Sequence, residues 1–235
     1  MKSGNLSPYL EEIRLLQKSI DYMELYRGLE IDFIPGIISP NMFREKLDYT
    51  IGSIHFVEQL PDGRHWEIDG QHTSFLEGLE KIFKNDIRDA VSRYFELTRD
   101  MVKTDCPSVV GHLDKIKIQN IDNRFFNESD AWYKNEVLDT LDAIASAGPV
   151  VEVNTRGIYQ KKSATTYPGP WILEYIHQKK IPVMLSADAH HPADIKNQFQ
   201  ETALLLREIG FRKISIIKDG QWQQYEFNEH GIICP

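Results

Sequence analysis

The stretch that decides the fold of this chain is PVMLSADAHHP, which spans Pro182–Pro192. Its apolar first half is typical of a buried strand, and Pro192 opens a long amphipathic segment that favours a helix. Residues two apart in a strand point to the same side, so Asp188 and His190 are predicted to converge at the strand's end. A carboxylate and an imidazole that converge suit a divalent metal ion. A single pair of this kind could also belong to an ordinary turn. The pair supports a metal site only if similar residues recur at the ends of other strands.

Strand and helix patterns alternate along the whole chain. Strands are expected at 25–34, 50–57, 108–114, 150–156 and the quoted stretch. Helices are expected from Ser7, over 73–102 with a break near Asn85, over 130–148, over 171–178 and over 193–208. Asp219-Gly220 indicates a terminal hairpin. No linker or repeat divides the sequence, so the pattern predicts one α/β domain over residues 1–235, with a parallel sheet or barrel.

Composition narrows the class of protein. The 235 residues include 27 Lys and Arg against 35 Asp and Glu, a net charge of −8, which argues against nucleic acid as the main partner. No apolar run approaches the roughly 20 residues that a membrane helix requires, and residues 1–5 do not resemble a secretory signal. Cys106 and Cys234 are expected to be reduced thiols, so the sequence predicts a cytoplasmic protein without a membrane partner.

Candidate metal ligands recur where strands end. Three of the eight histidines, His55, His112 and His190, lie at or near strand ends, Glu30 has the matching position on the first strand, and Asp188 accompanies His190. In a β/α barrel the carboxyl ends of the strands meet at one face. Any one of these histidines is more simply a core or loop residue, but the set favours a metal site. Mixed imidazole and carboxylate ligands suit Zn, Mn or Fe(II) better than Ca.

These residues fall in five short motifs. They are GLEID at 28–32, GSIHF at 52–56, GHLD at 111–114, EVNT at 152–155 and SADAH at 186–190. Each is weak alone, but in this order the chain resembles the PHP-type (polymerase and histidinol phosphatase) metal-dependent phosphoesterases, and among them the PHP-type histidinol-phosphatases. The resemblance runs from about Glu24 to the terminal hairpin.

The resemblance implies a distorted, seven-stranded, TIM-like β/α barrel, with up to three divalent ions (Zn, Mn or Fe) at the carboxyl ends of its strands in a complete member. Glu30 matches a bridging glutamate, and His55 and His112 match two ligands of the metal that it shares. Asp188 matches a ligand of the first metal, and His190 a ligand of the remaining one.

The resemblance also implies a small phosphate ester as substrate. Arg156 matches a phosphate-binding basic residue, and Lys161 and Lys162 are nearby candidates. Clustered metals neutralise the phosphate oxygens that would repel a nucleophile, and they lower the pKa of bound water. Both effects favour attack of that water on phosphorus. The acid that protonates the leaving alcohol stays open between Asp188 and His191.

The polar loop from Asp62 to Asp69 follows His55 directly. Histidinol phosphate carries a cationic amine, so Glu67 or Asp69 is a candidate to pair with it. A solvated loop in which Trp66 merely packs is an equally good interpretation.

The chain departs from the family pattern at its start. Family members begin with a His-x-His pair, and two further histidines precede the bridging glutamate, whereas no histidine precedes His55 here. About the first two barrel strands are therefore expected to be missing, which leaves open edges through which the chain would self-associate. A start placed too late explains this better than a silent, shortened relative, because the remaining ligand positions are intact.

The leading hypothesis is hydrolysis of L-histidinol phosphate to L-histidinol and phosphate in histidine biosynthesis. A neighbouring hypothesis keeps the metal site but changes the substrate to a protein phosphotyrosine or a nucleotide. A hypothesis from another class is a catalytically silent relative that only binds metal weakly or serves as an interaction module.

Overall fold

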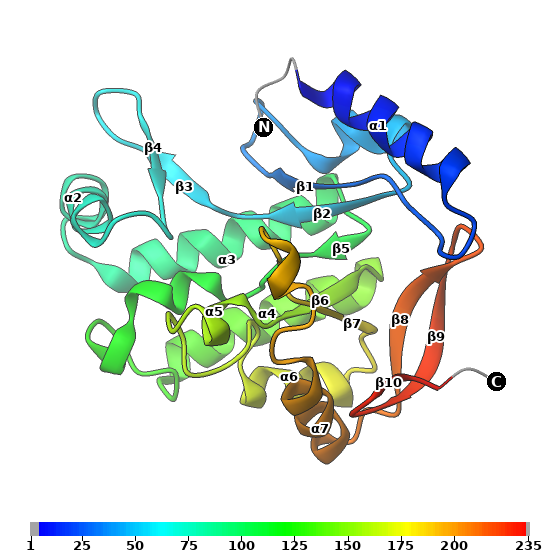
Figure 1. Cartoon of the computed structure of the whole chain (residues 1–235). Coiled ribbons are helices and arrows are strands. Elements are labelled where there is room, and N and C mark those ends of the chain that lie inside the picture. The colour runs from blue at the N-terminus through cyan, green and yellow to red at the C-terminus, as the bar shows by residue number, and fades with distance from the viewer. Residues whose placement is uncertain (1–4, 234–235) are drawn as a thin grey trace.

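The computed structural model describes residues 5–233, so Cys234 lies outside it (Figure 1). Its centre is a five-stranded sheet in the order β1-β2-β5-β6-β7. The strands are β1 (Gly28–Asp32), β2 (Tyr49–Ser53), β5 (Val109–Val110), β6 (Val150–Asn154) and β7 (Val183–Ser186). Every neighbouring pair is parallel, which confirms the predicted α/β architecture. Among the described residues this sheet is open, with β1 and β7 at its edges.

Helices cover and connect the strands. They are α1 (Leu6–Ser19), α2 (His72–Phe83), α3 (Ile87–Thr104), α4 (Ala131–Ala147), α5 (Arg156–Tyr159), α6 (Pro170–Gln178) and α7 (Phe199–Ile209). Short 3-10 turns are η2 (Pro40–Lys46), η3 (Lys115–Gln119), η4 (Ile121–Asn123) and η5 (Pro192–Asp194). The predicted break near Asn85 is confirmed, because Lys84 and Asn85 are left-handed and Asp86 accepts from the backbone N–H of Arg88 to cap α3. Among residues 5–233, no helix combines the length and apolar character needed to cross a membrane.

The core lies between the sheet and the paired helices α3 and α4, which run side by side (Figure 1). Phe95 of α3 and Tyr133 of α4 are fully buried and meet edge to face. All five residues of β6 are buried, as expected for a central parallel strand. This packing fixes the strands, whose carboxyl ends consequently lie along one edge of the sheet.

The predicted strand over 50–57 is two strands. β2 ends at Ser53, and β3 (Phe56–Gln59) leaves the parallel sheet to pair antiparallel with β4 (His65–Glu67). The loop expected around Trp66 is therefore partly a strand, with the indole buried and donating to the backbone oxygens of Ser74 and Phe75. Burying this large side chain against α2 is the physical reason for the extra hairpin.

The quoted stretch also differs from expectation. β7 ends at Ser186, so Asp188 and His190 lie in the loop beyond it. The two side chains do converge, with His190 Nδ1 3.5 Å from Asp188 Oδ1, but the loop and not strand alternation brings them together. Asp188 has a φ of 49°, in the left-handed region that few residues other than glycine adopt. The helix expected from residue 193 begins only at Phe199, because left-handed Gln198 separates it from η5.

A second, antiparallel sheet ends the described chain. It contains β8 (Lys213–Lys218), β9 (Gln221–Asn228) and β10 (Gly231–Ile232) in the order β10-β9-β8. The Asp219-Gly220 hairpin is confirmed, since both turn residues have positive φ.

Candidate metal and phosphate site

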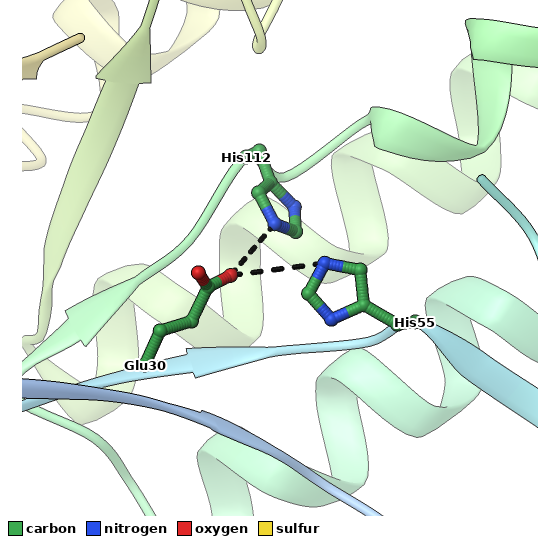
Figure 2. Close-up of side chains that lie close together, drawn as sticks. All are labelled: Glu30, His55 and His112. Atoms are coloured by element: carbon green, nitrogen blue, oxygen red, sulfur yellow. Dashed lines mark hydrogen bonds and ion pairs between the residues drawn. The ribbon is translucent and has the colours of Figure 1, made fainter. Parts of the chain in front are cut away.

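Three predicted ligands from three adjacent strands lie together. The ligand atoms of Glu30, His55 and His112 are all within 4.8 Å of one another, and Figure 2 shows the three side chains pointing toward one another. Glu30 Oε1 is 3.0 Å from His112 Nε2 and 3.7 Å from His55 Nε2. Glu30 is on β1, His55 follows β2 and His112 follows β5, so the parallel sheet brings them to one edge.

The carboxylate of Asp32, which was not among the predicted site residues, orients His55. Asp32 Oδ1 lies 2.6 Å from Nδ1 of His55. When Nδ1 donates this hydrogen bond, Nε2 keeps its lone pair and faces Glu30, as a metal ligand must. Asp32 stands two residues after Glu30 on β1, so both point to the same side of the strand. The two-residue spacing of Glu30 and Asp32 in the sequence could have indicated this role for Asp32.

Buried groups also fix His112 and Glu30. The backbone N–H of His112 donates to Glu152 Oε2 at 2.8 Å, and the Ser53 hydroxyl donates to Glu30 Oε1 at 2.7 Å. His112 is 1% exposed, and its Nδ1 has no hydrogen-bond partner among the described residues. These contacts hold the turn after β5 and the Glu30 carboxylate against β2.

A lysine and an aspartate complete this half of the site. Lys115 Nζ is 2.8 Å from Asp69 Oδ2, 3.2 Å from His55 Nε2 and 3.5 Å from His112 Nε2. Lys115 was not among the predicted site residues, although it follows His112 by three residues. Asp69, one of the two candidates for a substrate amine, has its Oδ2 paired with Lys115 and 3.9 Å from His55 Nε2.

The charges of these groups depend on one another. Burial alone would raise the pKa of Glu30, but the hydrogen bond and charge of His112 hold it well below its usual range. Burial would likewise raise the pKa of Asp69, and Lys115 and His55 bring it below its usual value. Burial would lower the pKa of His55, yet the hydrogen bond to Asp32 leaves it raised. The site therefore presents ionised carboxylate oxygens beside imidazole nitrogens.

These residues fit a divalent cation. Two imidazole nitrogens and a carboxylate oxygen converge, and Asp32 sets the tautomer of His55 that leaves Nε2 toward the centre. This is the mixed donor set that Zn and related transition metals favour.

A second group gathers at the ends of β6 and β7. Arg156 begins α5, and its Nη1 donates to the backbone oxygen of Asp188 at 2.5 Å and lies 2.6 Å from His190 Nδ1. Asn154 links the two loops, because its amide donates to Asp188 Oδ2 at 3.2 Å and its oxygen accepts from the Arg156 backbone N–H at 2.9 Å. The basic residue thus stands beside two of the predicted metal ligands.

Both groups line one pocket of about 310 Å³. All five predicted metal ligands contribute to its wall, as do Arg156, Lys162, Glu67 and Asp69. Lys161 and His191 are not part of that wall. The His191 ring instead accepts from the Ala193 backbone N–H and caps η5, which leaves Asp188 as the better placed of the two candidate acids.

No family model matches this chain. It is 28% identical over 223 residues to a probable histidinol-phosphatase of Deinococcus radiodurans, covering 92% of this chain and 76% of that protein. It is 24% identical to a probable histidinol-phosphatase of Schizosaccharomyces pombe, covering 90% of this chain and 69% of that protein. The histidinol-phosphatase of Bacillus subtilis is also 24% identical, covering 83% of this chain and 74% of that protein.

Solved structures show the same fold. A crystal structure assigned to histidinol phosphatase HisK of Listeria monocytogenes superposes with a TM-score of 0.74 at 20% identity, over 86% of this chain and 77% of that one. Histidinol phosphate phosphatase of Lactococcus lactis, solved with Zn, L-histidinol and phosphate, gives a TM-score of 0.61 at 20% identity, over 93% of this chain and 80% of that one. The resemblance drawn from the five motifs is therefore confirmed: this chain is related to the histidinol-phosphatases along most of its length and has their fold.

Proposed function

We propose that this chain is a metal-dependent phosphomonoesterase that hydrolyses L-histidinol phosphate to L-histidinol and phosphate, a step of histidine biosynthesis. The observation that carries the proposal is one pocket that holds a Glu30, His55 and His112 group together with the Arg156 guanidinium. The names of the relatives support this choice of substrate, as does the Lactococcus lactis complex with Zn, L-histidinol and phosphate.

Glu30, His55 and His112 would hold a divalent ion, with Zn, Mn and Fe as the candidates. Bound there, such an ion supplies a water of lowered pKa and neutralises phosphate oxygens. Asp188 and His190 are the candidate ligands of further ions, up to the three of a complete family member. Asp32 keeps His55 oriented, and Ser53 and His112 keep the Glu30 carboxylate in place.

The other residues of the pocket are proposed to bind different parts of the substrate. Arg156 offers a forked, charged donor for the phosphate, and Lys162 adds a second cation on the same wall. Cleavage of the P–O bond leaves an alkoxide that needs a proton. We propose that the Asp188 carboxylate, where it does not hold an ion, takes this proton from the attacking water and passes it to the alkoxide. Glu67, on the opposite hairpin, is the candidate partner of the substrate amine. Lys161 lies outside the pocket wall, so we expect a smaller contribution from it.

The test is phosphate release by purified protein loaded with Zn, Mn or Fe, with chelator-treated protein as the blank. Histidinol phosphate, a phosphotyrosine peptide and a nucleoside monophosphate are compared as substrates. We expect metal-dependent turnover of histidinol phosphate that His55→Ala abolishes and His230→Ala, a replacement of an exposed histidine, does not. Turnover of only the other phosphates would overturn the substrate, and bound metal without any turnover would favour the silent relative.

We also propose a cytoplasmic location and self-association through the open sheet edges at β1 and β7. Unpaired strand edges offer backbone donors and acceptors to a second copy. Sedimentation over a range of concentrations tests this, and a monomer throughout that range would exclude it.

A further inference from the structure

Lys115 places a cation beside the ring nitrogen that His55 would offer to a metal ion. Its Nζ lies 3.2 Å from His55 Nε2 and 3.5 Å from His112 Nε2. The side chain is only 12% exposed, so the ammonium is directed into the protein and not toward solvent. Lysine has three donors and no acceptor, so it can interact with these nitrogens only by donating to them.

In a neutral imidazole one ring nitrogen carries the proton, and only the other has a free in-plane lone pair. Asp32 engages Nδ1 of His55, which leaves Nε2 as the nitrogen that can face either the ammonium or a metal ion. A lone pair that accepts a hydrogen bond from Lys115 cannot bind a metal at the same time. At His55 Nε2 the two cations therefore exclude each other, whereas His112 Nε2 faces the Glu30 carboxylate at 3.0 Å and is not claimed by Lys115.

Charge strengthens this exclusion. An ammonium and a divalent ion repel each other, and the repulsion is large in a partly buried site where water screens little. Asp69 keeps Lys115 in place through the 2.8 Å contact between Nζ and Oδ2. Asp69 is itself 17% exposed, and its Oδ1 has no partner among the described residues. The lysine is therefore held at His55 by a partly buried ion pair.

We propose that Lys115 is a built-in competitor of the metal ion, which lowers the affinity of the Glu30, His55 and His112 site for divalent cations. The inference rests on the metal site proposed above and goes beyond it, because it assigns to this chain a residue that weakens metal binding. Metal entry requires the ammonium to leave His55 Nε2, and Asp69 is the group that keeps it nearby. The site then releases metal more readily than its ligands alone would allow.

The test is equilibrium binding of Zn and of Mn to the chelator-treated full chain, by competition with a chromophoric chelator. Lys115→Met removes the charge and the donors but keeps most of the side-chain length. It should bind metal about tenfold more tightly or better, the scale on which neighbours of metal ligands change affinity. Lys115→Gln, which keeps a donor without the charge, should lie between it and the wild type.

Lys162→Met is the matched control, because it removes the same charge from the same pocket wall. Its affinity should stay within about twofold of wild type, a small effect beside one near 1.4 kcal/mol. The rise in melting temperature on adding metal is a second readout, and it should be larger for Lys115→Met than for wild type.

Unchanged or weaker binding by folded Lys115→Met and Lys115→Gln, in a protein whose binding is lost in His55→Ala, would overturn this inference alone. Binding by Lys115→Met but not by wild type would support it in its strongest form. If neither wild type nor the variants bind metal, the proposed metal site fails and this inference fails with it.

Discussion

Replacing Asp32 tests whether the site depends on a residue that binds no substrate. Its carboxylate accepts from His55 Nδ1 at 2.6 Å, and it is the group that leaves His55 Nε2 free for a metal. In Asp32→Ala the imidazole loses this partner, so it can rotate or take the other tautomer. The fold should tolerate the change, because Asp32 ends β1 and its side chain is 34% exposed.

The size of the effect follows from the contact. A hydrogen bond to a charged group contributes about 1.5–3 kcal/mol when buried. Partial exposure of Asp32 places this one near the lower end, since solvent screens the charge. A loss of about 1.5 kcal/mol corresponds to roughly tenfold weaker metal binding. Asp32→Asn keeps an acceptor for Nδ1–H but loses the charge, so its loss should be smaller, about threefold.

The assay is Zn and Mn binding by competition with a chelator, together with the urea midpoint of the chelator-treated protein. Asp62→Asn is the control, because it removes one negative charge from an exposed turn where Asp62 pairs with Arg64. We expect metal affinity to fall in the order wild type, Asp32→Asn, Asp32→Ala, with the midpoint nearly unchanged. Equal affinities in all three would refute the idea that Asp32 sets the tautomer of His55.

Three further predictions concern other parts of the chain. Arg156→Ala should raise the KM for histidinol phosphate at least tenfold while bound metal, measured by atomic emission, changes little; equal losses of both would remove its phosphate role. Lys117→Met should lower the free energy of unfolding by about 3–5 kcal/mol, because it leaves the fully buried carboxylate of Asp114 unpaired, and adding Asp114→Asn should restore part of it in urea titrations. The Arg27 hydrogen bond holds the pKa of Asp48 below its usual value, so its stabilisation is present above about pH 4 and lost as the pH falls through the folded pKa. Asp48→Asn should therefore cost about 0.5 kcal/mol at pH 7 and flatten the pH dependence of the melting temperature below pH 4.

Much of the fold could be predicted because its elements have strong local signals. The helix break at Asn85, the end of α4 at Gly148 and the Asp219-Gly220 hairpin each depend on residues that favour left-handed backbone. The predictions were wrong where tertiary packing determines the secondary structure. Part of the expected polar loop forms β4 because Trp66 is buried, and no local pattern in residues 61–70 indicates that packing.

The candidate ligands were predictable for a topological reason. Parallel strands end at one edge, so Glu30, His55 and His112 could be expected together from their positions alone. Lys115 could not, because it lies in a 3-10 turn whose direction depends on how the chain leaves β5. The pairing of Asp69 with Lys115 could not be predicted for a similar reason, since it depends on how the β3 and β4 hairpin folds Asp69 toward His55.

The strand order explains why the pocket has two halves. β1, β2 and β5 are neighbours. Glu30 lies within β1, and His55 and His112 follow the ends of β2 and β5. β6 and β7 are the next pair, and the loops after them carry Arg156 and Asp188. The proposed cation site and the Arg156 guanidinium thus lie along the same sheet edge and line one pocket. This arrangement suits the proposed phosphate ester, because a metal ion and a guanidinium could then contact the same phosphate group. It also predicts that variants at β1 or β2 act on metal affinity, whereas variants at β6 act on KM.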